Sequence, residues 1–165
     1  MDAICELLLV AIDDVHRLMV VAFAYREEDL RAAFAHDLCM VGSDATALAT
    51  DGPLAGTSFH GAFTWAAWYF RHFVHDRRAL TPSEAVRRLT SLAAGRLGLS
   101  DRGVIRPGAW ADIAVFDPSV FAERGTTFEP NQAAIGMRHV LVNGQVALRD
   151  AQLTATRSGS VLRRG

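Results

Sequence analysis

Apolar residues in the first part of the chain fall into short continuous runs separated by helical stripes. Residues 1–14 have the spacing of a short helix, and residues 18–24 form a continuous apolar run, as expected for a strand buried on both faces. Residues 27–35 predict a helix, because acids occupy the first turn, where the helix dipole favours them. The apolar run 38–41 predicts a second strand. Strand, helix and strand in this order indicate a βα unit of the parallel-sheet type.

A long loop and two helices follow this unit. Residues 45–61 are rich in Gly, Thr and Ala and predict a loop, and a loop of this length inside a compact domain is often functional. Residues 62–78 carry a helical apolar stripe. Thr81-Pro82-Ser83-Glu84 is a capping box with proline at the first helical position, and it predicts a helix that ends near Gly95 or Gly98.

Short strands replace helices after about residue 100. Residues 103–105 and 111–117 are predicted strands separated by a turn. Residues 139–148 predict a β-hairpin, because Asn143-Gly144 at its centre suits a tight turn in which both residues have positive φ. The pattern therefore predicts an α/β chain whose last third is mostly β.

The composition and charge of the chain exclude several classes of protein. Half of the 165 residues are apolar and 21% are charged, which predicts a folded chain with a sizeable core. The net charge of −1 gives no general attraction to nucleic acid or to an anionic membrane. Two cysteines make no disulfide framework, and no apolar run reaches the ~20 residues that span a bilayer. We therefore predict a soluble, cytoplasmic protein without a nucleic-acid or membrane partner.

Polar residues follow the predicted strand 38–41 directly. Ser43 and Asp44 stand at the carboxyl end of that strand, where α/β folds place their chemistry. His60 closes the long loop and could contact a substrate carboxylate or a metal. The residues alone leave alternatives open: Asp44 also suits a cap on the strand-to-loop turn, and His60 also suits a solvated loop position.

Two further groups in residues 62–78 need an interpretation. His72 and His75 are spaced i, i+3 and share a helix face, but no acidic or cysteine partner with ligand spacing accompanies them. Neighbouring arginines favour a solvated cationic face instead of a metal site. The helix also carries a cluster of aromatic residues, which we interpret as core or subunit packing before ligand stacking: Trp65, Trp68, Tyr69, Phe70 and Phe73.

Three segments form a recognisable combination. They are Val41-Gly42-Ser43-Asp44, residues 80–103, and residues 105–117 followed by the hairpin at 139–146. The third is the most specific, with an R-x-G-x-x-A-D-hydrophobic-x-x-F-D run and a later V-N-G hairpin. Together they resemble the C-terminal end of the N-acyl-D-amino-acid deacylase (D-aminoacylase) branch of the amidohydrolase superfamily, the branch being inferred from Ser43-Asp44 and residues 125–130.

The resemblance implies a metal-dependent (β/α)₈ barrel, carrying one or two zinc ions and hydrolysing an amide, followed by part of a small β-sandwich. Residues 1–100 would be the C-terminal end of the barrel and residues 101–165 the end of the sandwich. Asp44 matches the aspartate that ends the last barrel strand, contacts the metal and takes a proton from the attacking water. The substrate implied is an N-acyl-D-amino acid or a related amide, with Ser43 and His60 as candidate binding residues.

The chain lacks much of what such an enzyme needs. A (β/α)₈ barrel takes about 250 residues, and the family's His-x-His pair, bridging ligand and mid-barrel histidines have no match here. Zinc needs three protein ligands, so Asp44 alone could not retain it. We expect a C-terminal fragment of a zinc-dependent hydrolase acting on non-peptide C–N bonds, inactive in isolation.

Two alternatives remain from the sequence. One is a non-catalytic remnant that is stable through self-association. The other is a fragment of a related cyclic-amide hydrolase or deaminase. The substrate is left open, because Ala45 stands where family members commonly have glycine and residues 51–60 depart from the family's loop.

Overall fold

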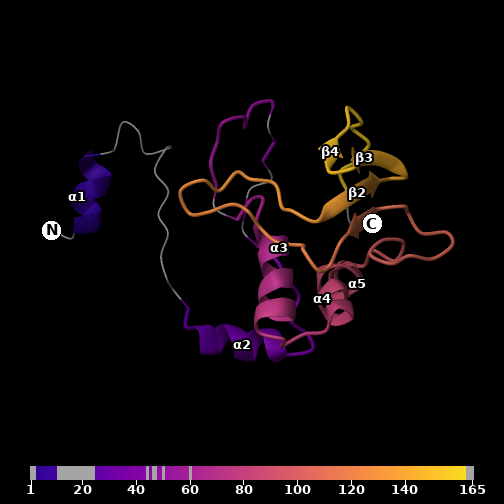
Figure 1. Ribbon diagram of the computed structural model, residues 1–165, viewed down its shortest axis with the longest axis horizontal. Helices are drawn as coiled ribbons and strands as arrows, with labels where there is room; N and C mark the ends of the chain where they lie inside the picture. The colour runs from indigo at the N-terminus through magenta and orange to yellow at the C-terminus, as the bar shows by residue number, and fades with distance from the viewer. Residues whose placement is uncertain are drawn as a thin grey trace.

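The computed structural model describes residues 3–10, 25–43, 45, 48–49, 51–59 and 61–162, and helices precede strands along the chain (Figure 1). The helices are α1 (Ala3–Val10), α2 (Glu27–Ala35), α3 (Trp65–Phe70), the π-helix η2 (Arg71–Asp76), α4 (Pro82–Leu89) and α5 (Ser91–Leu97). The strands are β1 (Ile113–Phe116), β2 (Met137–Val142), β3 (Gln145–Arg149) and β4 (Gln152–Leu153). The chain therefore has mixed helix and strand content, as predicted.

The core joins the aromatic helix to the sheet. Tyr69, Phe70 and Phe73 are each 1% exposed, so the packing interpretation of the aromatic cluster is confirmed for these three side chains. The Phe70 ring lies edge-on to Phe116 of β1, with centroids 5.3 Å apart, and to Phe121, at 5.7 Å. Edge-to-face pairs of this kind add to the stabilisation that comes from burying the rings.

Most of residues 62–78 are helical, as predicted, but the helix changes from α-helical to π-helical hydrogen bonding along its length. From Arg71 onward it is π-helical, and the N–H of Arg77 donates to the carbonyl of His72, five residues earlier, over 2.9 Å. π-Helical turns are rare and often accompany functional sites. The wider winding decides where the arginines and histidines of this segment point.

The Thr81 cap and the helix start are confirmed, but the reciprocal half of the capping box is not formed, because the Glu84 carboxylate accepts from Arg87 and Arg88. The prediction of a single helix from this start is wrong. The Thr81 hydroxyl accepts a hydrogen bond from the N–H of Glu84 over 3.2 Å. The helix breaks at Thr90, whose hydroxyl donates to the carbonyl of Val86 over 2.7 Å, a bond that bends helices. α5 then ends at Gly98, which has the left-handed φ of 77°.

The four strands form one antiparallel sheet in the order β1-β2-β3-β4. The hairpin of β2 and β3 turns at Asn143 and Gly144, with φ of 49° and 79°, as the sequence predicted. Strand β4 was not predicted. Its turn uses Asp150 and Ala151, which take positive φ without a glycine to signal it.

Two predicted strands are wrong, and one prediction lies outside the described residues. Residues 38–41 form no strand, because no described segment pairs with their backbone groups, and Leu38 is 56% exposed. Residues 103–105 form no strand, because the chain bends at Gly103, which has φ 74° and packs against α5. A Cβ at Gly103 would lie 2.8 Å from that of Ala94. The predicted strand at 18–24 falls outside the described part of the chain.

Within the described ranges, no helix has the length and apolar character needed to cross a membrane.

Candidate functional site

A cavity of about 610 Å³ lies where three segments meet. One segment leads out of residues 38–43, the second enters α3, and the third is the loop after Phe121. Its lining residues are small, hydroxylated or aromatic, with one acid: Ser43, Ala45, Gly61, Thr64, Trp65, Trp68, Glu123, Gly125, Thr126 and Thr127. Of the segments used for the resemblance, residues 41–44 reach this cavity through Ser43, and residues 125–130 reach it through Gly125, Thr126 and Thr127.

Of the three predicted site residues, Ser43 lines this cavity. Asp44 and His60 lie outside the described residues, although each is adjacent in sequence to lining residues. The Ser43 hydroxyl accepts a hydrogen bond from the N–H of Ala45 over 3.1 Å. Serine hydroxyls commonly accept such local backbone hydrogen bonds before a loop.

Glu123 is the one charged residue among the described lining residues, and Arg71 pairs with it. The Arg71 guanidinium donates to both carboxylate oxygens, over 2.9 Å from Nε and 2.5 Å from Nη2. Burial is the largest single cause and acts to raise the pKa of Glu123, but the hydrogen bond from Arg71, a backbone hydrogen bond and the positive charge of Arg71 together outweigh it, and the pKa is lowered. The same hydrogen bonds raise the pKa of Arg71. The carboxylate in the cavity wall is therefore paired with a cation, which Asp76 shares.

The interpretation of the flanking arginines as a solvated cationic face is wrong in part. Arg71 contacts Asp76 as well as Glu123, and Arg77 contacts Glu27 of α2. Arg71 in η2 and Arg77 just after it thus pair with Glu123 and Glu27, which are about 50 positions away in sequence. Sequence spacing alone could not show these partners.

His72 and His75 have separate environments. His72 stacks on Trp68, with ring centroids 4.8 Å apart and planes 14° apart. Burial is the main cause that lowers the pKa of His72, and the charge of Arg77 adds to it. Nε2 of His75 lies 2.6 Å from the carbonyl oxygen of Pro118. Each ring therefore has its own packing or hydrogen-bonding contact.

Gly125 lines one side of the cavity, where its backbone passes close to Thr64 and Pro130. A Cβ at this position would lie 2.5 Å from both the carbonyl oxygen of Pro130 and Cγ2 of Thr64. Thr126 and Glu129 exchange hydrogen bonds of 3.0 Å across the same loop. Sequence reasoning used residues 125–130 only for the family branch. Their glycine and threonines were the available signal for a tight loop beside the site.

Residues 51–59, from the loop predicted to face the substrate, are tied to the C-terminal third of the chain. The Asn131 side chain donates to the carbonyl of Thr57 over 2.7 Å, and Arg157 donates to Asp51 over 2.5 Å. These contacts join residues 74 and 106 positions apart.

The described residues do not make a zinc site by themselves. No group of three or more His, Cys, Asp or Glu side chains among them is arranged to hold a metal ion. Zinc takes at least three protein ligands, even in an open catalytic site. No chemical step is therefore assigned to zinc from these residues.

Comparison with known proteins gives the class of this α/β chain. A family model described as the amidohydrolase family matches residues 12–148. The N-acyl-D-glutamate deacylase of Alcaligenes xylosoxydans xylosoxydans is 39% identical over 142 residues, which are 86% of this chain and 28% of that enzyme. The chain belongs to the amidohydrolase family, as the resemblance predicted.

Solved structures agree with this assignment. The N-acyl-D-glutamate deacylase of Bordetella bronchiseptica, complexed with zinc and a phosphonate mimic of the tetrahedral intermediate, matches with a TM-score of 0.71 and 37% identity. That match covers 86% of this chain and 28% of the solved chain. A D-aminoacylase studied for its binuclear metal centre matches with a TM-score of 0.60 and 33% identity, over 62% of this chain and 22% of its own. The chain thus spans between 22% and 28% of the length of these relatives.

Proposed function

We propose that this chain is the C-terminal part of a zinc-dependent amidohydrolase that hydrolyses N-acyl-D-amino acids at their non-peptide C–N amide bond. Residues 1–100 would form the end of its (β/α)₈ barrel and residues 101–165 the end of its small β-sandwich. The observation that carries the proposal is the cavity beside Ser43, where the segment leading to Asp44, the start of α3 and the 125–127 loop meet.

The proposed chemistry assigns one role to each predicted residue. Asp44 contacts the metal site and accepts a proton from the attacking water as general base. Ser43, whose hydroxyl accepts from the N–H of Ala45, holds that carboxylate or contacts the substrate. His60 binds the substrate carboxylate. Zinc, when bound, would polarise the amide and lower the pKa of its water, and the remaining ligands would have to come from outside the described residues.

A hybrid enzyme tests this proposal. The chain would replace the matching C-terminal region of the Alcaligenes N-acyl-D-glutamate deacylase, and hydrolysis of a panel of N-acetyl-D-amino acids would be measured with and without chelator. We expect metal-dependent hydrolysis, which Asp44→Asn lowers by roughly 10²- to 10⁴-fold, the range attributed to general acid–base groups. The matched control is Asp150→Asn, at an aspartate whose side chain is 83% exposed and lies outside the candidate site. A folded hybrid whose activity survives Asp44→Asn would contradict the role of Asp44.

A second candidate is a non-catalytic, self-associating remnant. It is motivated by large apolar side chains that stay exposed, including Phe128 at 95% and Ile105 at 87%. Contiguous exposed apolar surface favours association. Sedimentation of the isolated chain tests this idea, and a monomer with a cooperative thermal transition would count against it. Adding cyclic amides and an aminated heterocycle to the substrate panel tests the related cyclic-amide hydrolase and deaminase alternatives.

A further inference from the structure

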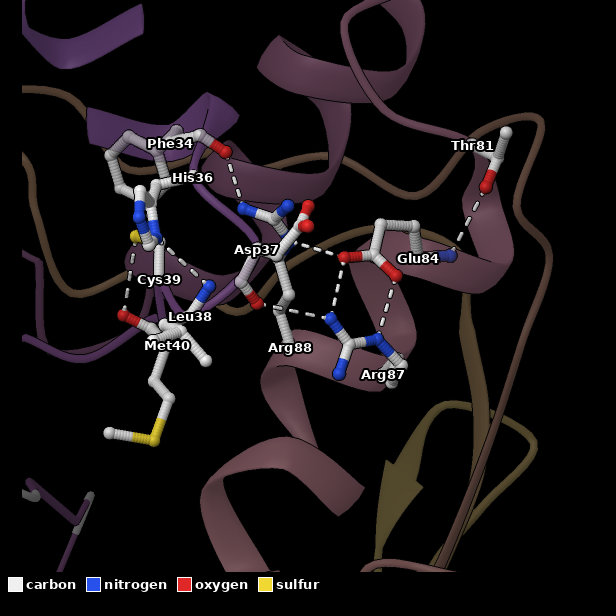
Figure 2. A network of polar contacts seen from close by, with 10 residues as sticks. All are labelled: Phe34, His36, Asp37, Leu38, Cys39, Met40, Thr81, Glu84, Arg87 and Arg88. Atoms are coloured by element: carbon white, nitrogen blue, oxygen red, sulfur yellow. Dashed lines mark hydrogen bonds and ion pairs between the residues drawn. The ribbon is translucent and has the colours of Figure 1, made fainter. Parts of the chain in front are cut away.

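Two arginines of α4 hold the turn that follows α2 (Figure 2). Arg88 donates from Nη1 to the carbonyl of Phe34, in the last turn of α2. Arg87 donates from Nη2 to the carbonyl of Asp37 over 3.3 Å. The last carbonyls of a helix have no donor within the helix, so side chains from elsewhere often satisfy them. Here both donors come from one neighbouring helix.

Glu84 fixes both arginines from the same helix face. Its Oε1 accepts from Nε of Arg88 over 2.7 Å and from Nη2 of Arg87 over 2.8 Å. Its Oε2 accepts from Nε of Arg87 over 2.7 Å. The Arg88 side chain is only 2% exposed, and a buried guanidinium needs partners of this kind. We call Glu84, Arg87 and Arg88 the arginine clamp.

The clamped turn opens directly into the segment that ends at the candidate site. Nδ1 of His36 accepts from the N–H of Leu38 over 3.2 Å, and the carbonyl of His36 accepts from the N–H of Cys39 over 2.9 Å (Figure 2). Val41 packs against the hydrophobic core, and Ser43 lines the cavity. The short segment is therefore fixed at its start by the clamp and in its middle by the core.

We propose that Arg88, held by Glu84 and assisted by Arg87, is a positioning residue for the segment that carries Ser43 and Asp44. The inference rests on the proposed function of Asp44 as proton acceptor. The clamp contacts the backbone at Phe34 and Asp37, and so it fixes the start of the segment that leads to Ser43. A general base must be placed closely, and a displacement of 1 Å can cost on the order of 10²-fold in rate. Because the clamp contacts backbone rather than the cavity, its loss should lower kcat more than it raises KM.

Kinetics of the hybrid enzyme test the catalytic consequence. Arg88→Met should lower kcat by roughly 10- to 100-fold, with KM within about twofold. Arg88→Lys keeps a cation for Glu84 and should recover part of the loss. The control is Arg96→Met on α5, an exposed arginine that should leave both constants within about twofold. An effect mainly on KM would overturn the proposal. So would a kcat that falls only in proportion to the fraction of folded enzyme.

Hydrogen exchange on the 165-residue chain tests the clamp without any need for activity. Arg88→Met should speed exchange in residues 36–43, including the Cys39 amide, and leave the β2–β3 hairpin unchanged. If Arg88→Met fails to fold, Glu84→Gln gives the same test by weakening both arginine contacts. A folded parent hybrid without activity would overturn the proposed function and, with it, the catalytic part of the inference. Exchange in residues 36–43 that neither variant changes would overturn the clamp itself.

Discussion

The N–H of Asn143 donates a hydrogen bond of 2.8 Å to Oδ1 of Asp112, and Arg102 donates to the other oxygen of the same carboxylate. Arg102 also donates to Oδ1 of Asn143 over 2.9 Å. The N–H of Gly144 reaches the carbonyl of Ala111 over 3.0 Å. The two most recognisable motifs of the sequence are therefore one hydrogen-bonded unit, and the structure gives Asp112 a structural role.

Removing the Asp112 carboxylate should destabilise this unit. Asp112→Ala leaves the Asn143 N–H and the Arg102 guanidinium without their acceptor, so we expect a loss of about 1–3 kcal/mol in the free energy of unfolding. The control is Asp150→Asn, at a site 83% exposed, where a change within about 0.5 kcal/mol is expected. Urea unfolding followed by circular dichroism measures both. Equal losses in the two variants would show that the Asp112 contacts do not stabilise the fold.

Truncating the Phe70 side chain should lower the free energy of unfolding more than most other single substitutions. It is 1% exposed and joins α3 to Phe116 and Phe121, so Phe70→Ala should cost about 3–5 kcal/mol through lost burial and a residual cavity. Phe128, 95% exposed, is the matched control, and Phe128→Ala should change stability by less than about 0.5 kcal/mol. Thermal unfolding compares the two variants. A small effect of Phe70→Ala would contradict the assignment of the core.

Acid should weaken the arginine clamp. Hydrogen bonds from Arg87, and then from Arg88, lower the pKa of Glu84 from 4.5 to about 2. A carboxyl with a lowered pKa in the folded state contributes stability above its unfolded pKa and loses it as pH falls, here between about pH 4.5 and 2. Glu84→Gln should therefore be less stable than the parent at pH 6, with the difference shrinking toward pH 2. A difference that stays constant with pH would contradict this linkage.

Protonation of His72 should also oppose folding. Burial is the main cause that lowers its pKa from 6.5, so the unfolded chain binds this proton more readily. Stability linked to His72 is thus present above pH 6.5 and falls as pH drops below it. Because His72 stacks on Trp68, tryptophan fluorescence should change with a midpoint below pH 6.5, and His72→Gln should remove that change. A midpoint above pH 6.5 would contradict the burial of this ring.

Local signals in the sequence predicted elements where the decisive contacts are close along the chain. Residues 27–35 match the bounds of α2. The Thr81–Glu84 cap and the Asn143-Gly144 turn appear as predicted, because a capping bond spans three residues and a tight turn depends on the φ of its own residues.

Predictions failed where distant contacts decide the structure. A strand at residues 38–41 needs a neighbour to pair with, and the described structure holds the preceding turn through the arginine clamp instead. At the candidate site the sequence singled out Ser43 but missed Glu123, whose partner Arg71 lies 52 positions away. Asp44 and His60 stay predictions, since they lie outside the described residues.

The sequence by itself determined the amidohydrolase resemblance, the Thr81 cap, the hairpin and the candidate residue pair Ser43-Asp44. Those features depend on residue identity and on spacing within a few positions. Only the tertiary structure decided that Glu123 in the cavity wall pairs with Arg71, that Gly125 must pass close to Thr64, and that Arg88 reaches back to Phe34. Each of these depends on side chains brought together from distant segments, and hydrophobic packing of α3 against the sheet brings those segments together.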